Sequence, residues 1–226
     1  MTARVVTDAA ELAAVHAELL VPAFPPEELV TADELVQAVD AGSCEVLLLE
    51  DAEGPLAVAV GDRFTEAGVV LLSYVATRPG ARSGGHGGRL LDAALDRWRG
   101  WTGPCLVLAE VEDPGRHEAS PERGDPVARL RFYARRGARR LDLPYVQPAL
   151  RPGAVRVPDL LLLCLHAAPE LRRGPDAVDG RAVRAFLERL FTDGEGRLPT
   201  DPQGRALLAA AGERVAALPI GPAPAA

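Results

Sequence analysis

Five glycines lie within nine residues, between an apolar run typical of a strand and an amphipathic stretch typical of a helix. They are Gly80, Gly84, Gly85, Gly87 and Gly88, in the stretch RPGARSGGHGG. Glycine allows positive φ angles and lets the backbone come within hydrogen-bond distance of a ligand. Successive N–H groups then form a concave array of donors, and a helix N-terminus adds about half a positive charge. The pattern predicts a pyrophosphate site, with an unliganded glycine-rich turn as the alternative.

The spacing of the glycines in this loop distinguishes between three known phosphate-binding motifs. A Walker loop requires Gly-Lys, and the sequence contains no Lys. A dinucleotide fingerprint that starts at Gly85 meets Leu90 at its third glycine position; it stays open as an alternative, with Glu110 as its ribose-binding acid. The spacing that fits is Arg-x-x-Gly-x-Gly, formed by Arg82, Gly85 and Gly87.

A second pattern lies downstream, in the stretch RFYARRGA from Arg131 to Ala138. Together, the two stretches resemble motifs A and B of the GNAT superfamily of N-acetyltransferases, with Ala138 in place of the usual Phe. The resemblance covers residues 3–166 and includes the order of the elements. It implies an α+β fold with a mixed, mostly antiparallel central sheet that is flanked by helices and splayed at its centre. It also implies acetyl-CoA as the donor substrate.

The resemblance assigns a donor site by position. In that family, the strand before the loop pairs with the pantetheine arm of CoA, and the loop amides hold the pyrophosphate. The arm-binding stretch is then Tyr74, Val75, Ala76 and Thr77, with Thr77 in place of a small aliphatic residue. The loop residues are Arg82, Ser83, Gly84, Gly85, His86, Gly87, Gly88 and Arg89.

Transfer of an acetyl group from a thioester to an amine makes further demands. A base is needed, because an amine with a pKa near 10 is protonated at neutral pH. The tetrahedral oxyanion needs a donor, and the N–H of Val75 or Ala76 is placed for that. The resemblance brings Tyr133 to the CoA sulfur, where a phenol can protonate the departing thiolate.

Two carboxylates and two polar side chains are candidates for the acceptor side. Strand alternation puts Glu110 and Glu112 on one face, toward the C-terminal end of a predicted strand. Either could act as the base; the alternative is that both are surface charges. Tyr145 and Gln147 follow where a strand leaves the core, and they either line the acceptor site or form a plain turn.

The elements that would position these residues alternate between strands and helices. Residues 1–169 are expected to form the acetyltransferase domain, and 170–226 a C-terminal helical extension of unknown role. The predicted strands cover residues 3–7, 44–50, 55–61, 68–77, 105–112, 138–146 and 157–166. The predicted helices follow Asp8 and cover 26–39, 85–99, 125–136, 179–192 and 203–217.

Composition narrows the classes of partner. The formal net charge is −7 and the pI about 5.2, which argues against nucleic acid or an anionic membrane as partner. The start of the sequence has no pattern of a signal peptide, so we expect a cytoplasmic protein. The three cysteines form no CxxC pair, so we expect free thiols and no metal site. The expected partner is a small-molecule amine attacked directly in a ternary complex, with a homodimer left open. A non-catalytic acyl-CoA-binding module is the alternative function.

Overall fold

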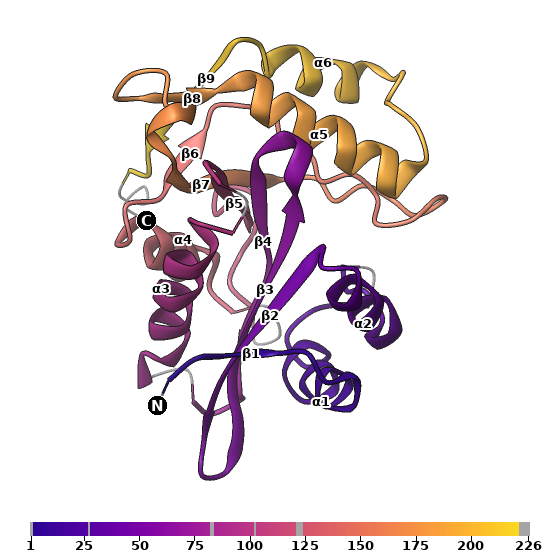
Figure 1. Ribbon diagram of the computed structural model, residues 1–226. Helices are drawn as coiled ribbons and strands as arrows, with labels where there is room; N and C mark the ends of the chain where they lie inside the picture. Colours follow the sequence, from indigo (N-terminus) through magenta and orange to yellow (C-terminus); the bar gives the residue numbers. More distant parts are fainter. Residues whose placement is uncertain (1, 27, 82–83, 102, 121–123, 222–226) are drawn as a thin grey trace. The chain divides into compact units, whose positions relative to one another are not determined.

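Nine strands and six α-helices are present in the part of the chain that the structure describes (Figure 1). This structure is a computed structural model that describes residues 2–26, 28–81, 84–101, 103–120 and 124–221. The chain divides into two compact units, one of residues 1–63 and 71–101 and the other of 64–70 and 102–226. The strand pairs for which a register is resolved are antiparallel, as predicted for the sheet.

The first unit holds four strands in the order β1-β2-β3-β4, with helices on both faces (Figure 1). Val5 pairs with Leu47 between β1 and β2, and Cys44 pairs with Asp62 between β2 and β3. The strands are β1 (Arg4–Val6), β2 (Cys44–Asp51), β3 (Gly54–Phe64) and β4 (Val69–Thr77). The helices are α1 (Ala9–Val15), which continues as a π-helical turn (His16–Leu20), α2 (Ala32–Asp40) and α3 (His86–Trp98).

Apolar stripes fix the two helical layers of the first unit. Leu12 of α1 and Leu35 of α2 pack with Val46 and Val60 of the sheet in one buried cluster. On the other face, the Trp98 ring of α3 lies against β3, where a Cβ at Gly61 would come within 2.6 Å of it. Only glycine therefore allows this approach between helix and strand.

The predicted helix at 26–39 begins later than expected, and this expectation was wrong for its first part. Thr31 and Glu34 form a capping box, in which the Glu34 N–H donates to Thr31 Oγ1 at 3.2 Å and the Thr31 N–H to Glu34 Oε2 at 2.7 Å. This box satisfies the first amides of the helix, which therefore starts at Ala32. The preceding segment, 21–31, is irregular within its described residues.

The second unit holds the strands in the order β5-β7-β6-β9-β8. Each neighbouring pair is antiparallel, and β7 pairs with β5 from Leu106↔Ala167 to Glu112↔Leu160. The strands are β5 (Leu106–Glu112), β6 (Arg139–Leu141), β7 (Leu160–Ala167), β8 (Ala177–Asp179) and β9 (Arg214–Pro219). The helices are α4 (Pro126–Ala134), α5 (Gly180–Glu195) and α6 (Pro202–Ala210).

Residues 170–226, predicted as a helical extension, also contribute strands to this sheet. The predicted helix at 203–217 is correct only as far as Ala210, because 214–219 form β9. Val215 and Ala217 are buried while their neighbours are more exposed, which is the period of a strand. β9 pairs with β6 on one side and β8 on the other. The predicted strand 138–146 shrinks to β6, because the chain turns away before Pro144.

Candidate functional site

The donor loop of the first unit connects β4 to α3. Arg78 N donates to Leu56 O at 2.8 Å where β4 ends, and a turn follows in which Gly80 has a φ of 87°. Gly85 has a φ of 69° and is the N-cap of α3. Both glycines occupy the left-handed region that other residues avoid. Arg82 and Ser83, which belong to the predicted loop, lie outside the described residues.

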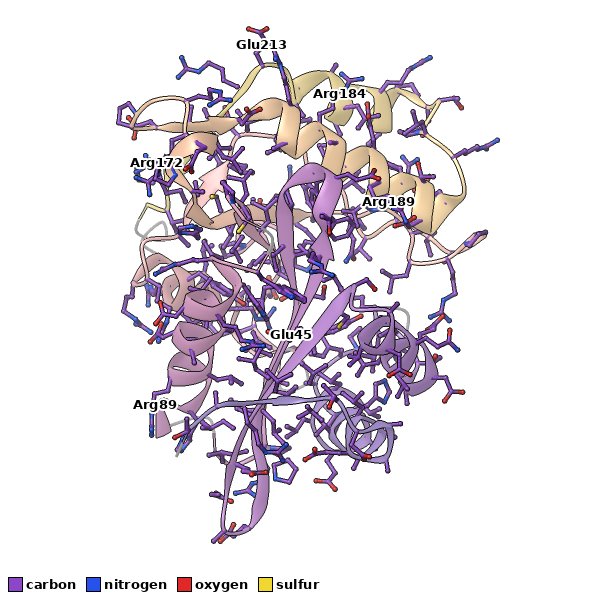
Figure 2. The ribbon with its side chains drawn as sticks, viewed as in Figure 1. Glu45, Arg89, Arg172, Arg184, Arg189 and Glu213 are labelled. Carbon is purple, nitrogen blue, oxygen red and sulfur yellow. The ribbon has the colours of Figure 1, made fainter. Side chains whose placement is uncertain are left out.

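The first turn of α3 offers backbone donors. No side chain among the residues that the structure describes caps this helix, and its first internal bond runs from Arg89 N to Gly85 O at 3.1 Å. The N–H groups of His86, Gly87 and Gly88 therefore have no partner within the helix. An anion at this end meets these donors together with the positive end of the helix dipole. Arg89 is exposed on the same turn (Figure 2).

Glycine at two loop positions keeps this end of the helix compact. A Cβ on Gly87 would lie 3.2 Å from Thr77 Cγ2, so the first turn packs against the end of β4. A Cβ on Gly84 would lie 2.1 Å from His86 Nε2, because the imidazole folds back over the loop. The Nδ1 of His86 is buried and meets no hydrogen-bonding atom among the described residues. The sequence did not indicate this placement of His86.

The predicted arm-binding stretch, Tyr74 to Thr77, alternates between buried and half-buried side chains. The side chain of Tyr74 points into the protein. Its hydroxyl donates to Glu28 O at 3.0 Å and accepts from Val30 N at 3.2 Å. Its ring meets Phe24 edge-on with centroids 5.0 Å apart. The side chain of Tyr74 thus holds Phe24, Glu28 and Val30, and it points away from a ligand that pairs with the strand.

These contacts indicate that the Tyr74 side chain stabilises the folded state. We expect Tyr74→Phe to lower the free energy of unfolding by about 1–3 kcal/mol, because the partly buried Val30 amide loses its phenolic partner. The ring and its contact with Phe24 are kept, so packing should change little. Urea unfolding followed by circular dichroism measures the difference, and an unchanged midpoint would contradict this role.

In the second unit, Glu110 joins two residues that lie 35 and 37 positions away along the chain. The Tyr145 hydroxyl donates to Glu110 Oε1, and Gln147 Nε2 donates to Oε2 at 2.8 Å. Gln147 is fixed by backbone bonds in both directions with Val157, at 3.0 and 3.1 Å. The structure therefore brings together Glu110, Tyr145 and Gln147, here called the Glu110 cluster.

Burial controls the ionisation of Tyr145. Burial and the nearby Glu110 charge raise the pKa of Tyr145 well above its usual value, so the phenol stays protonated and donates. Glu110 keeps partial exposure. A half-exposed carboxylate held by two fixed donors is suited to orient a polar ligand group.

Glu112 has a different environment from Glu110. Its carboxylate accepts from Arg129 Nη1 at 2.8 Å, in an ion pair between β5 and α4. The Glu112 side chain is 11% exposed, while that of Arg129 is 36% exposed. Of the two predicted base candidates, Glu112 accepts from the Arg129 cation, and Glu110 accepts from Tyr145 and Gln147.

Tyr133 lies on α4 and is buried, with its ring edge-on to Phe132 at 5.1 Å. Burial raises the pKa of Tyr133 to about 12, although Arg129 and Arg136 act in the opposite direction. The helix ends at Ala134, earlier than the predicted Arg136, and the turn that follows contains Gly137 with a φ of 79°; the Ala138 N–H donates to Tyr133 O at 3.2 Å. A phenol with this pKa is a hydrogen-bond donor throughout the neutral range.

Two negative findings concern the described residues. No group of three or more His, Cys, Asp or Glu side chains is arranged there to hold a metal ion. No helix in the same ranges combines the length and apolar character needed to cross a bilayer.

Similarity to known structures identifies the fold. An acetyltransferase of the GNAT family from Bacteroides thetaiotaomicron is 24% identical with a TM-score of 0.58, over 73% of this chain and 86% of that one. An acetyltransferase from Salmonella typhimurium, determined with acetyl-CoA, is 18% identical with a TM-score of 0.53, over 77% and 97%. A ribosomal-protein-alanine N-acetyltransferase from Brucella melitensis is 19% identical with a TM-score of 0.52, over 73% and 98%. No protein-family model and no curated protein sequence matches the chain.

These similarities show that the chain has the fold of the GNAT acetyltransferases. The resemblance inferred from the two sequence motifs is thereby confirmed at the level of the fold.

Proposed function

We propose that the chain is an acetyl-CoA-dependent N-acetyltransferase that moves the acetyl group to a primary amine of a small molecule. The observation that carries the proposal is the uncapped start of α3 behind Gly85, directly after β4, in a chain with the GNAT fold. The similar structure from Salmonella typhimurium was determined with acetyl-CoA, which supports the choice of donor. The amides of His86, Gly87 and Gly88 in this loop hold the pyrophosphate, and the backbone of Tyr74 to Thr77 pairs with the pantetheine arm.

The amine attacks the thioester directly, without an acetyl-enzyme. The three cysteines Cys44, Cys105 and Cys164 are free and buried. Burial raises the pKa of the Cys44 thiol strongly and that of Cys164 to about 12, so neither is a thiolate near neutral pH. The sequence contains no lysine that could carry the group instead.

The acceptor is held by the Glu110 cluster. Two fixed donors hold the Glu110 carboxylate in a set direction, and an amine supplies N–H groups of the kind that a carboxylate accepts. The N–H of Val75 or Ala76 stabilises the oxyanion, and Tyr133 donates a hydrogen bond to the departing sulfur.

Acceptor-dependent release of thiol tests this function. Acetyl-CoA is incubated with the protein and a panel of primary amines, and free CoA thiol is measured with a chromogenic disulfide. We expect release above background with at least one amine and none with the matching alcohol. Binding of acetyl-CoA without release for any amine would instead support an acyl-CoA-binding module. A thermal shift with NAD(P) and none with CoA would support a dinucleotide enzyme.

Removal of the Tyr133 hydroxyl should slow turnover moderately. Transfer of its proton to a thiolate of pKa about 8.5 would be uphill by about 5 kcal/mol, since Tyr133 has a pKa of about 12. The hydroxyl therefore acts as a donor of a hydrogen bond. We expect Tyr133→Phe to lower kcat about 10-fold to 100-fold with an unchanged Kd for acetyl-CoA. The variant should also keep the wild-type pH profile between pH 6 and about 10, and a lost alkaline limb would contradict this role.

A further inference from the structure

Three side chains from neighbouring strands of the first unit meet at Asp62, near the end of β3. Cys44 lies directly opposite Asp62 in the register between β2 and β3, and its thiol is hydrogen-bonded to the carboxylate. The Ser73 hydroxyl of β4 donates to Asp62 Oδ2. None of these three residues was indicated as functional by the sequence motifs, and none has a role in the mechanism described so far.

The Asp62 carboxylate has only neutral partners. Among the described residues, no arginine or histidine forms an ion pair with Asp62. Its neighbour Arg63 is directed elsewhere: the guanidinium donates to Gly42 O and lies 5.0 Å from the centre of the Trp101 ring. A hydroxyl and a thiol compensate a buried negative charge poorly, because the thiol is a weak donor. No cation of the described residues therefore balances the negative charge of Asp62. A cationic ligand would supply the missing positive charge.

Burial makes this carboxyl group more basic than an ordinary aspartate. It raises the pKa of Asp62, and the hydrogen bonds from Ser73 and Cys44 reduce that shift. Asp62 and Ser73 nevertheless keep partial exposure, while Cys44 is buried. A base with a raised pKa is better matched to proton transfer at neutral pH.

The position of Ser73 relates Asp62 to the donor stretch. Ser73 directly precedes Tyr74, the first residue of the proposed arm-binding stretch, and the pyrophosphate loop follows its last residue, Thr77. An arm that starts at the loop and runs back along β4 therefore has its thioester end nearest Tyr74 and Ser73. Successive strand residues are about 3.3 Å apart, so this end lies about 13 Å from Thr77. At that end of β4, the Ser73 hydroxyl donates a hydrogen bond to the Asp62 carboxylate.

We propose that Asp62 is the proton acceptor for the attacking amine and that the site selects acceptors with a cationic alkylamine. This inference rests on the proposed acetyl transfer. The ammonium group pairs with Asp62 and gives it one proton, which later passes to solvent. The nitrogen lone pair then attacks the thioester carbon; a C–N bond forms and the C–S bond breaks. The second proton of the nitrogen ends on the departing sulfur, which leaves as a thiol.

This assignment separates the roles of two carboxylates. Each oxygen of Glu110 accepts from a fixed side-chain donor, which suits Glu110 to position the acceptor. Asp62 accepts from one hydroxyl and from a thiol, which is a weak donor. Its carboxylate is therefore less stabilised by hydrogen bonds than that of Glu110 and takes a proton more readily.

The test compares Asp62→Asn with Asp40→Asn, the same chemical change on the exposed last residue of α2. For an alkylamine at pH 7, we expect Asp62→Asn to lower kcat at least about 100-fold and to leave the Kd for acetyl-CoA within about 2-fold. Asp40→Asn should match the wild type. An aromatic amine, which is neutral at pH 7, should lose less than about 10-fold in Asp62→Asn, since it needs no prior deprotonation.

The possible outcomes decide the proposal. A wild-type kcat in Asp62→Asn, or an equal loss for charged and neutral amines, overturns the role of Asp62 while the acetyl transfer stands. A wild-type protein that transfers to no amine overturns the proposed function and this inference with it. If Asp62→Asn does not fold, as judged by circular dichroism and acetyl-CoA binding, Asp62→Glu replaces it. That variant keeps a base, so it should retain a ratio of charged-amine to neutral-amine rates near that of the wild type, and loss of the ratio would contradict the proposal.

Discussion

Gly87→Asp should lower the affinity for acetyl-CoA at least about 100-fold. The new carboxylate would lie in the first turn of α3, among the N–H groups that are proposed to hold the pyrophosphate. Two like charges about 4 Å apart near a protein surface repel by about 4 kcal/mol, which corresponds to roughly 1,000-fold in affinity. Isothermal titration calorimetry with acetyl-CoA measures the loss.

Two companion variants isolate the charge in this prediction. Gly87→Ala adds the same Cβ, 3.2 Å from Thr77 Cγ2, without a charge, and we expect less than about 10-fold loss. Gly100→Asp adds the same charge just beyond the C-terminal end of α3, where a Cβ has open space, and should bind acetyl-CoA as the wild type does. Equal losses in Gly87→Ala and Gly87→Asp would show that shape and not charge governs this position.

Glu110→Gln should lower kcat/KM for the amine about 100-fold, mainly through a higher KM. The amide cannot accept from both Tyr145 and Gln147, because one of its two ends is a donor. The Glu110 cluster then loses its fixed geometry, and one buried donor is left without its acceptor. Steady-state kinetics with the best amine, at saturating acetyl-CoA, measures the effect.

The control for this prediction is Glu188→Gln, which alters an exposed i,i+4 pair with Arg184 on α5. Its kinetics should equal those of the wild type. Tyr145→Phe should reproduce part of the Glu110→Gln effect, since it removes one of the two donors. An unchanged KM in Glu110→Gln would place the acceptor elsewhere.

The local parts of the fold could be predicted from the sequence. The glycine spacing at Gly85 and Gly87 and the apolar stripe of α3 are short-range signals, and both gave the correct strand-loop-helix. The predicted start of α2 near Pro26 is too early, because the Thr31–Glu34 capping box sets the first helical residue at Ala32. The strand β9 was missed, because a short alternating run after α6 was read as more helix.

The individual residues of the candidate acceptor site could be predicted from the sequence, but their arrangement in space could not. Glu110, Tyr145 and Gln147 were each singled out, yet their meeting depends on the irregular path between β6 and β7, which no local pattern encodes. Asp62 was missed altogether. Its only signal is a carboxylate that continues an apolar strand, and its significance arises from partners 18 and 11 residues away on β2 and β4.

Transfer of a labelled acetyl group tests the central claim most directly. The wild-type protein is mixed with acetyl-CoA that carries a radiolabelled acetyl group, with and without a primary amine, and the protein and small molecules are then separated. We expect label on the amine when both substrates are present, and no label on the protein when acetyl-CoA is alone, because the cysteines are buried. Label that stays on the protein would contradict direct attack. Bound acetyl-CoA with no label on any amine would contradict the acetyltransferase itself.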